Sequence, residues 1–477
     1  MKTIIAISAG HDSSKKVENR IRSRIRYLNY GLLGLATILK HQGGIDIIVY
    51  QADSYNVDAL FDVIERSGIN IISDCECFLL SIPSYYSMSW SIKFCEAVRQ
   101  RYQKKVIVGG RWVVDNHVDW VKEQLKYVDV IIEGFGEKKL AQYFNLPNCN
   151  EFPDGSTKCF DWLDYTLLYE YTKYQPCIEI SRGCGAGCQF CADKSNMRLQ
   201  NKSIDLVMYE LDYLNQTYGS YSVYFEAPHF SFEPMWIKSL CNRVFSRNQQ
   251  FMWRCTSRVE SVPISFLSMM SAAGLKVLDI GLESASPQQL INMKKTKSPK
   301  KYLDLADKLL VACAKNGIWV KFNLLLYAGE TYQTINETTK WLIDRKELIK
   351  DVSVSNLVYY YNMDSILELQ KLGASIPYGN KIEKNGFVEL NLSHDIDRDT
   401  AKQLSVDIPK LIANQKDFYE IKTISYFEPG YSYLEFIEDV KHSNRSSLPF
   451  SVDFSIDETE TNNTVRHIQM DSASNER

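Results

Sequence analysis

The sequence lacks any uninterrupted run of about 18 apolar residues, which a membrane-spanning helix requires, so we expect no membrane partner. It also lacks the core of a signal peptide, because the apolar run that starts at Met1 ends at Ile7. This predicts a cytoplasmic protein. Charge of one sign is not in excess either: Lys and Arg number 55, Asp and Glu number 58, and the net charge is -3. That balance argues against nucleic acid as the main partner.

The length and composition are those of a multidomain globular chain. At about 150 residues per domain, the chain of 477 residues predicts roughly three domains. Apolar residues make up 45% and charged residues 24%, which excludes collagen-like, coiled-coil and wholly disordered chains. Without an export signal, the 12 cysteines are expected to be reduced thiols or metal ligands rather than disulfides.

Residues 1–145 alternate short apolar runs with amphipathic segments, which predicts a Rossmann-like, doubly wound α/β domain with a parallel sheet. The predicted strands are Thr3–Ala9, Ile45–Tyr50, Cys77–Pro83, Lys105–Val108 and Val128–Glu133. In such sheets ligands bind beyond the carboxyl ends of the strands. Gly109, Gly110, Gly134 and Gly136 follow strands there, and either close backbone approach to a ligand or a tight turn accounts for them.

Residues 146–175 form a predicted linker, because the stretch from Asn145 to Thr157 is rich in Asn, Pro, Asp and Gly. Over residues 176–358 strands and helices alternate again, which predicts a partial (β/α)6 barrel of the TIM type. The predicted strands are Cys177–Ser181, Ser222–Glu226, Phe251–Cys255, Val277–Leu282, Ile318–Leu326 and Val352–Val358.

The pattern weakens after the barrel. Residues 359–450 are predicted to form a mixed region that caps it. A helix is expected over Asp399–Phe418, interrupted by Pro409. Residues 451–477 are acidic and almost without aromatic residues, which predicts a disordered tail.

Three cysteines, Cys184, Cys188 and Cys191, directly follow the first predicted strand of the barrel. Glycines crowd the same loop and would let it fold around a bulky inorganic group without Cβ clashes. A structural zinc normally needs four protein ligands, and Cys177 would be available to complete such a site. Three closely spaced thiolates at a strand end better suit an iron-sulfur cluster with one open iron.

This loop resembles that of the radical S-adenosylmethionine (SAM) enzymes, whose signature is C-x3-C-x2-C with an aromatic residue before the last cysteine, here Phe190. The resemblance implies that Cys184, Cys188 and Cys191 hold a 4Fe-4S cluster whose fourth iron binds SAM. It further implies that one-electron reduction cleaves SAM to methionine and a 5′-deoxyadenosyl radical. An external one-electron reductant such as flavodoxin or ferredoxin is therefore an expected partner.

Two further positions resemble the same family. The segment Ile280–Ala285 resembles its fourth-strand motif, which implies that Glu283 and Ser284 contact SAM. Arg258, just past the third strand, resembles an arginine that binds the SAM carboxylate. These residues would complete a SAM site beside the cysteine loop.

Two other segments depart from the family pattern. Leu325–Thr331 keeps a Gly-Glu-Thr but has Tyr-Ala where relatives carry Leu-Pro. Phe225–Phe230 lacks both aspartates that relatives often have there. Roles for Glu226 and His229 are therefore weakly supported.

The N-terminal domain resembles the cobalamin-binding domain that precedes the barrel in one subgroup of these enzymes. The matching segments are Leu32–Ala36, Val108–Gly110 and Val128–Glu137. The resemblance implies that cobalamin is a cofactor and lies against Gly109, Gly110, Gly134 and Glu137. The chain has only Gly10-His11-Asp12 where some cobalamin domains carry Asp-x-His-x-x-Gly, and Asp115–His117 matches half of that motif after the wrong strand. We therefore expect no histidine on the lower face of cobalt.

A basic run follows the first strand and comprises Lys15, Lys16, Arg20, Arg22, Arg24 and Arg26. The two-residue spacing of the arginines predicts an extended loop rather than a helix with one basic face. A solvated loop is one interpretation. Pairing with phosphates or carboxylates of a cofactor or substrate is the other.

Together the two resemblances imply a cobalamin-dependent radical SAM methyltransferase. Radical chemistry suits C-methylation of an unactivated carbon, because such a C–H bond offers no nucleophile for polar methyl transfer. The expected substrate is a small-molecule natural product or a peptide, and no catalytic residue is predicted. One alternative is a non-methylating radical SAM enzyme for cyclisation, rearrangement or oxidation. Another is a non-catalytic protein that senses cobalamin or the cluster.

Overall fold

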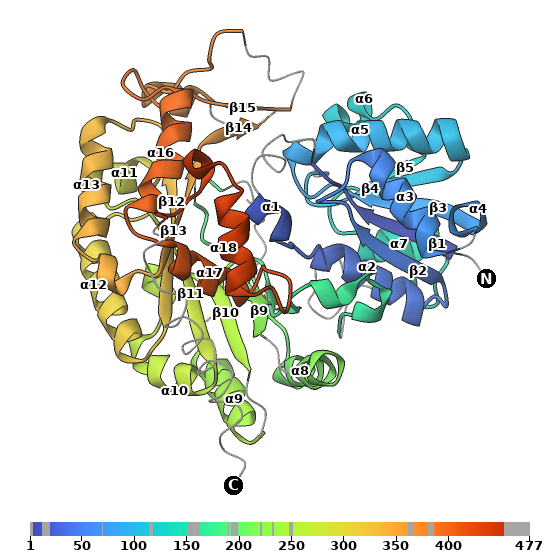
Figure 1. The fold of residues 1–477 in the computed structure, drawn as a ribbon, viewed down its shortest axis with the longest axis horizontal. Helices are drawn as coiled ribbons and strands as arrows, with labels where there is room; N and C mark the ends of the chain where they lie inside the picture. The colour runs from blue at the N-terminus through green and yellow to red at the C-terminus, as the bar shows by residue number, and fades with distance from the viewer. Residues whose placement is uncertain are drawn as a thin grey trace.

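The computed structural model has two lobes, an N-terminal one and a larger one built from the rest of the chain (Figure 1). It describes residues 3–11, 20–68, 70–113, 118–149, 162–188, 190–191, 199–219, 222–230, 233–247, 251–360, 366–379 and 386–452. Within these ranges, no helix combines the length and the apolar character that crossing a membrane would require.

The N-terminal lobe is a five-stranded parallel sheet with helices on both faces, which confirms the predicted fold class. The strand order is β2-β1-β3-β4-β5, with β1 (Thr3–Ser8), β2 (Asp46–Gln51), β3 (Cys75–Ser81), β4 (Lys105–Gly109) and β5 (Val130–Ile131). Side chains alternate along β1, so Ile4 and Ala6 join one hydrophobic core while Ile5 and Ile7 join the other.

Different helices cover the two faces of this sheet. One face packs against α3 (Val57–Ser67), α4 (Ile71–Asp74), α5 (Met88–Ala97) and α6 (Val118–Gln124). The other packs against α2 (Tyr30–His41) and α7 (Glu137–Tyr143), and its core continues into the second lobe. The described part of the predicted linker adds backbone contact, because Tyr169 N donates to Val49 O at 2.9 Å. The lobes are therefore packed together rather than tethered.

The second lobe contains the predicted open barrel of six parallel strands in the order β13-β12-β11-β10-β9-β6. The strands are β6 (Cys177–Glu179), β9 (Ser222–Glu226), β10 (Met252–Arg258), β11 (Leu275–Glu283), β12 (Trp319–Leu326) and β13 (Asp351–Asn356). Its helices are α8 (Ile204–Tyr218), α9 (Pro234–Phe245), α10 (Leu267–Ala272), α11 (Pro287–Asn292), α12 (Pro299–Lys315) and α13 (Tyr332–Ile343).

The described part of the C-terminal region adds an antiparallel pair of strands, β14 (Val358–Tyr360) and β15 (Phe387–Glu389). It also adds α14 (Ile366–Lys371) and further helices. These are α16 (Arg398–Lys410), α17 (Gln415–Thr423) and α18 (Tyr433–Lys441). The predicted helix over Asp399–Phe418, interrupted by Pro409, is two helices in the structure: Pro409 lies in the last turn of α16, and Asn414 caps α17 by accepting from Asp417 N at 2.9 Å. Most of the predicted disordered tail, residues 453–477, lies outside the described residues.

Helix α17 docks on the barrel through buried charges. Arg254 of β10 is fully buried and forms a bidentate pair with Asp279 of β11, at 2.5 and 2.8 Å. Its third nitrogen donates to Ile421 O of α17 at 3.2 Å. Burial and the nearby Lys321 lower the pKa of Lys422 to about 7. Because buried charges are costly without partners, this arrangement specifies how the cap sits against the barrel.

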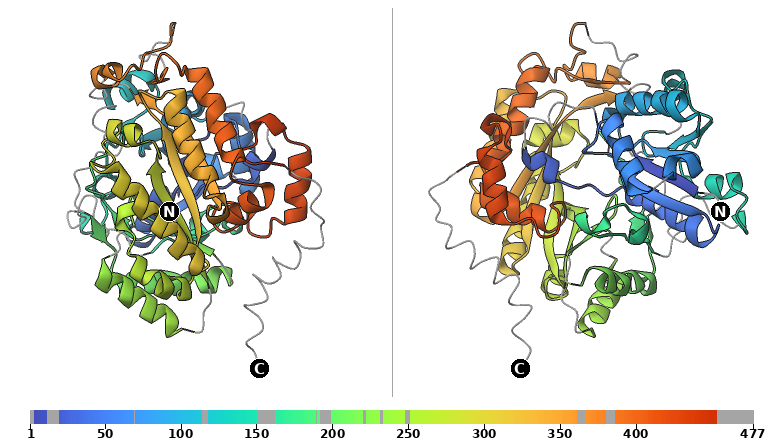
Figure 2. Two further views of the ribbon diagram at one scale, coloured as in Figure 1. Left: turned by 90° about the vertical axis from the view of Figure 1, so that its left-hand side faces the viewer. Right: turned by 45° about the vertical axis from the view of Figure 1, so that its right-hand side comes forward.

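The basic run forms a clasp between the lobes. Arg20–Arg24 is a short helix, α1, which lies beside α18 of the cap (Figures 1 and 2). The predicted extended loop is therefore wrong for these residues, because Ile21 is buried among cap side chains. Lys15 and Lys16 lie outside the described residues.

Two arginines of the clasp pair with carboxylates of the cap. Arg24 Nε lies 3.0 Å from Asp439 Oδ2, and Arg26 Nε donates to Glu428 Oε1 at 2.7 Å. The backbone joins as well, since Arg26 N donates to Tyr426 O at 2.7 Å. The clasp thus connects the loop after β1 to a segment about 400 residues away in the chain, as the separation of 402 between Arg26 and Glu428 shows.

The clasp predicts energetic coupling between Arg26 and Glu428. In a double-mutant cycle of Arg26→Met and Glu428→Gln, we expect a coupling of about 1 kcal/mol in the free energy of unfolding, because both side chains are largely buried. Denaturant unfolding of the four proteins measures it. The Arg243–Asp205 pair, 42% and 84% exposed, is the control and should show almost none. Equal coupling in the two pairs would contradict the clasp.

Candidate cluster and cofactor site

The cysteine loop begins where β6 ends, at the carboxyl edge of the barrel. A small antiparallel pair, β7 (Ser181–Arg182) with β8 (Gln200–Asn201), brackets it. Gly183, Gly185 and Gly187 all have left-handed backbone, with φ of 77°, 67° and 62°. A Cβ added at Gly185 or Gly187 would meet nothing within 4 Å, so these glycines serve the path of the chain rather than close packing.

Cys184, Cys188 and Cys191 are partly exposed free thiols, whereas the other described cysteines are buried apart from Cys149. Among the described residues, no three His, Cys, Asp or Glu side chains converge to hold a single metal ion. A mononuclear site would require such convergence, whereas each cysteine of an iron-sulfur cluster binds a different iron.

Arg258 is the residue that the structure brings to this loop. It ends β10, and its Nη1 lies 2.8 Å from Cys188 Sγ, while Nε donates to Glu260 at 3.1 Å. Phe190, the aromatic residue before the last cysteine, is partly buried and packs against the main core. The resemblance implied that Arg258 binds the SAM carboxylate and that Phe190 belongs to the cysteine motif; in the structure Arg258 contacts the loop that contains Phe190.

Glu283 and Ser284 follow the next strand but face different surroundings. Glu283 ends β11, and its Oε1 lies 3.2 Å from Lys295 Nζ. The Ser284 hydroxyl is buried, lies 3.0 Å from Thr338 Oγ1 and accepts from Ser286 N at 3.0 Å. Glu283 is thus the more open of the two, whereas Ser284 shapes the turn after the strand.

A buried ion-pair network joins the two lobes directly before the cysteine loop. Arg182 makes a bidentate pair with Glu179 of β6, with both distances 2.9 Å. Its Nη1 donates to Glu137 Oε1 of α7 at 2.7 Å. Glu137, predicted from the sequence as a cobalamin contact, therefore also anchors the barrel. Its second oxygen, Oε2, is buried and has no hydrogen-bond partner among the described residues.

The glycines at the carboxyl ends of strands in the N-terminal sheet differ in the space around them and in why a glycine is needed. Gly110 has φ of 109°, and a Cβ there would lie 2.6 Å from Ile82 N, so the turn itself requires a glycine. A Cβ at Gly109 would lie 3.2 Å from Ile132 O. Gly134 has φ of 67° and open space around it. Of the three, Gly134 leaves most room beside the chain.

The two histidines singled out in the sequence have different surroundings. His11 follows β1, with Nδ1 3.0 Å from Ser87 Oγ and Nε2 3.7 Å from Asp53. His229 Nε2 is buried without a hydrogen-bond partner in the described chain, and burial and Arg258 lower its pKa. The half-motif Asp115–His117 lies outside the described residues.

Glu226, to which the sequence analysis gave little weight, is a titratable residue at the carboxyl edge of the barrel. It ends β9 and is in register with Glu179 on the neighbouring strand. Burial raises its pKa to about 8, although Arg254 lowers it. The pKa of Tyr30, the first residue of α2, is also raised, by burial and by Glu226 and Glu179. The sequence signal that could have identified Glu226 is a titratable residue at a strand end. In the structure its neighbours come from both lobes.

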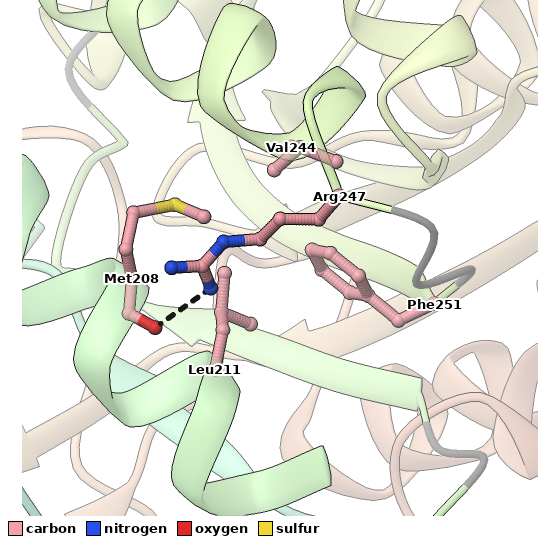
Figure 3. Close-up of a pocket in the computed structure, with 5 residues that line it drawn as sticks. All are labelled: Met208, Leu211, Val244, Arg247 and Phe251. Atoms are coloured by element: carbon pink, nitrogen blue, oxygen red, sulfur yellow. Dashed lines mark hydrogen bonds between the residues drawn. The ribbon is translucent and has the colours of Figure 1, made fainter.

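A separate small pocket lies on the outside of the barrel, between α8 and α9 (Figure 3). It is lined by Met208, Leu211, Val244, Arg247 and Phe251. Arg247 reaches into it and donates to Met208 O at 3.1 Å. Because it lies away from the strand ends, this pocket is not part of the cysteine site.

Two joined parallel sheets, with a cysteine loop where their carboxyl ends meet, define an α/β protein whose ligand site lies at strand ends. Residues 178–342 match the family model described as the Radical SAM superfamily. The chain therefore contains a radical SAM domain. An uncharacterized methyltransferase from Pyrococcus horikoshii is 27% identical over 167 residues, which are 34% of this chain and 36% of that protein. The match thus spans about a third of the relative.

Solved structures share the fold over both lobes. The radical SAM methyltransferase TsrM from Kitasatospora setae, with tryptophan substrate and a SAM analogue bound, has a TM-score of 0.63 and 12% identity, covering 98% of this chain and 100% of that chain. The cobalamin-dependent SAM radical enzyme OxsB, with aqua-cobalamin and SAM bound, has a TM-score of 0.57 and 13% identity, covering 78% and 55%. At these identities the likeness concerns the fold.

The raised pKa of Glu226 predicts that this carboxyl group lowers the stability of the folded protein as pH rises. A folded-state pKa of about 8, against an ordinary value of 4.5, means that the folded protein holds this proton more tightly than the unfolded chain. Its contribution to stability is present below the ordinary pKa and is lost as pH rises towards 8. We expect Glu226→Gln to gain melting temperature relative to the wild type across that range, measured by thermal unfolding. Glu123→Gln, at an exposed position of α6, is the control, and parallel curves for wild type and Glu226→Gln would refute the assignment.

Proposed function

We propose that this protein is a cobalamin-dependent radical SAM methyltransferase that methylates an unactivated carbon of a small-molecule or peptide substrate. The observation that carries the proposal is the position of the cysteine loop where the strand ends of the two sheets meet. Arg182, directly before the loop, bonds Glu137 of the other lobe at 2.7 Å. A substrate held between these edges is within reach of cofactors bound to either lobe, as group transfer requires.

Cys184, Cys188 and Cys191 are the residues proposed to hold the cluster. The left-handed glycines give the loop the turns needed to wrap an inorganic group, and the Arg258 guanidinium beside Cys188 compensates the charge of a thiolate. Arg258 and Glu283 are the proposed SAM contacts, because a guanidinium binds a carboxylate and a carboxylate accepts from hydroxyl or ammonium groups. When bound, the cluster supplies reductive cleavage of SAM and cobalamin supplies a transferable methyl group.

The carboxyl edge of the N-terminal sheet has groups suited to cobalamin. Gln51 Oε1 at the end of β2 and Glu137 Oε2 are buried acceptors without hydrogen-bond partners among the described residues. The periphery of a corrin carries amide N–H donors, which would satisfy such acceptors. Gly134 leaves open space at the same edge. Gln51, Glu137 and Gly134 are the proposed cobalamin contacts, together with Gly109 and Gly110. The last two shape the neighbouring turn.

The comparisons support the methyltransferase assignment in two ways. The similarity to TsrM and OxsB extends over both lobes, which supports pairing the barrel with a cobalamin domain. The curated relative is described as a methyltransferase. We further propose that the protein acts in the cytoplasm with an external one-electron donor such as flavodoxin or ferredoxin, because the proposed cleavage of SAM consumes one electron.

Anaerobic reconstitution with iron, sulfide and hydroxocobalamin tests the function. The wild type should bind about four irons and one corrinoid per chain and form 5′-deoxyadenosine from SAM and reductant, measured by metal analysis, visible absorption and mass spectrometry. Cys188→Ala should lose the cluster and the product. Cys241→Ala, at a buried thiol of α9, is the matched control and should keep both. Product without bound corrinoid would favour the non-methylating alternative, and no product would favour a sensor.

A further inference from the structure

Glu283 has a backbone conformation that needs support. Its φ is 67°, in the left-handed region, and the pairing of β11 with β12 shifts register between Gly281 and Glu283. A left-handed conformation costs a residue with a Cβ on the order of 1 kcal/mol or more. Such an irregularity at a strand end redirects the side chain. Neighbouring groups must therefore hold the Glu283 carboxylate in place.

Lys295 provides this support. Its side chain is 2% exposed, the Glu283 side chain is 13% exposed, and Nζ lies 3.2 Å from Oε1. The lysine itself is held firmly, because Lys295 N donates to Leu290 O at 3.0 Å as the chain leaves α11. A buried ammonium without its carboxylate would cost several kcal/mol, so the two groups are held together.

Gly281 makes the room that this pair occupies. A Cβ at Gly281 would lie 2.6 Å from Glu283 Oε1 and 3.4 Å from Lys295 Nζ. Its backbone is fixed from the other side, because Tyr302 OH donates to Gly281 O at 2.9 Å. The glycine therefore lets the carboxylate fold back onto the lysine.

The same lysine is also tied to the cysteine loop. Arg258 donates from Nη2 to Lys295 O at 3.5 Å, while its Nη1 lies 2.8 Å from Cys188 Sγ. Lys295 Nζ pairs with Glu283 Oε1, and no described residue forms a hydrogen bond with Glu283 Oε2. The lysine thus stands between the arginine at the loop and the carboxylate, with one carboxylate oxygen left for a ligand.

We propose that Lys295 is a positioning residue for SAM. It anchors Glu283 Oε1 so that Oε2 accepts a hydrogen bond from SAM beside Cys188, and it acts through Glu283 without touching SAM. This inference rests on the proposed function, because it presupposes a SAM site next to the cysteine loop.

Equilibrium dialysis of SAM against the reconstituted full chain under anaerobic conditions tests the inference. We expect Lys295→Met and Glu283→Gln each to weaken SAM binding about tenfold, the factor that about 1.4 kcal/mol represents. The double variant should be no weaker than Glu283→Gln alone, because the lysine has nothing left to position. Lys295→Arg keeps the charge and should bind within about threefold of the wild type, a smaller loss than 1.4 kcal/mol.

Lys321→Met is the matched control. Lys321 is also a buried lysine beside a carboxylate of β11, 3.7 Å from Asp279, but it lies deeper in the barrel. This variant should leave SAM affinity unchanged. Iron content and circular dichroism, measured on every variant, should match the wild type.

Four results would overturn the inference. They are wild-type affinity in Lys295→Met, a double variant weaker than Glu283→Gln, an equal loss in Lys321→Met, and a full loss in Lys295→Arg. A double variant weaker than Glu283→Gln would mean that Lys295 touches SAM itself. If Lys295→Met does not fold, the double variant still decides, because it buries no unpaired charge. A wild type that holds its cluster but binds no SAM would instead refute the proposed function, and the inference with it.

Discussion

A buried guanidinium joins the two lobes at the point where the cysteine loop begins. Arg182 is 8% exposed and lies between Glu179 of its own lobe and Glu137 of the other, which are 8% and 4% exposed. Two carboxylates share one cation in a poorly hydrated setting, and burial raises the pKa of Glu179. Removing one partner from such a network costs about 3–5 kcal/mol, because a charge is left buried. The loop therefore starts at a fixed place relative to the N-terminal sheet.

The rest of the site follows from this constraint. Because parallel strands end at one edge, β6, β9, β10 and β11 bring their last side chains to the same side of the barrel as the loop. Arg258 and Glu283 come from two of these strand ends, and Lys295 links them. The clasp of Arg24 and Arg26 on the cap provides a second connection between the lobes. Two separate connections restrict how the lobes rotate about each other, which suits chemistry that uses cofactors from both.

Much of the fold was predictable from the sequence because its signals are local. Buried parallel strands are short apolar runs, and the spacing of Cys184, Cys188 and Cys191 needs no tertiary information. Lys295 was not predictable, since it stands 12 residues after Glu283 and meets it only when β11 and α11 are packed. Helix α1 was mispredicted because its partners lie more than 400 residues away. There tertiary contacts, rather than the local spacing of arginines, decide the conformation.

We propose that the strand ends of the two lobes hold two cofactors close to one substrate. Pulsed dipolar electron paramagnetic resonance, on protein that carries both a reduced cluster and paramagnetic cob(II)alamin, measures this most directly. We expect a magnetic coupling between the two centres, which disappears in Cys188→Ala. Two fully loaded centres without any coupling would contradict it.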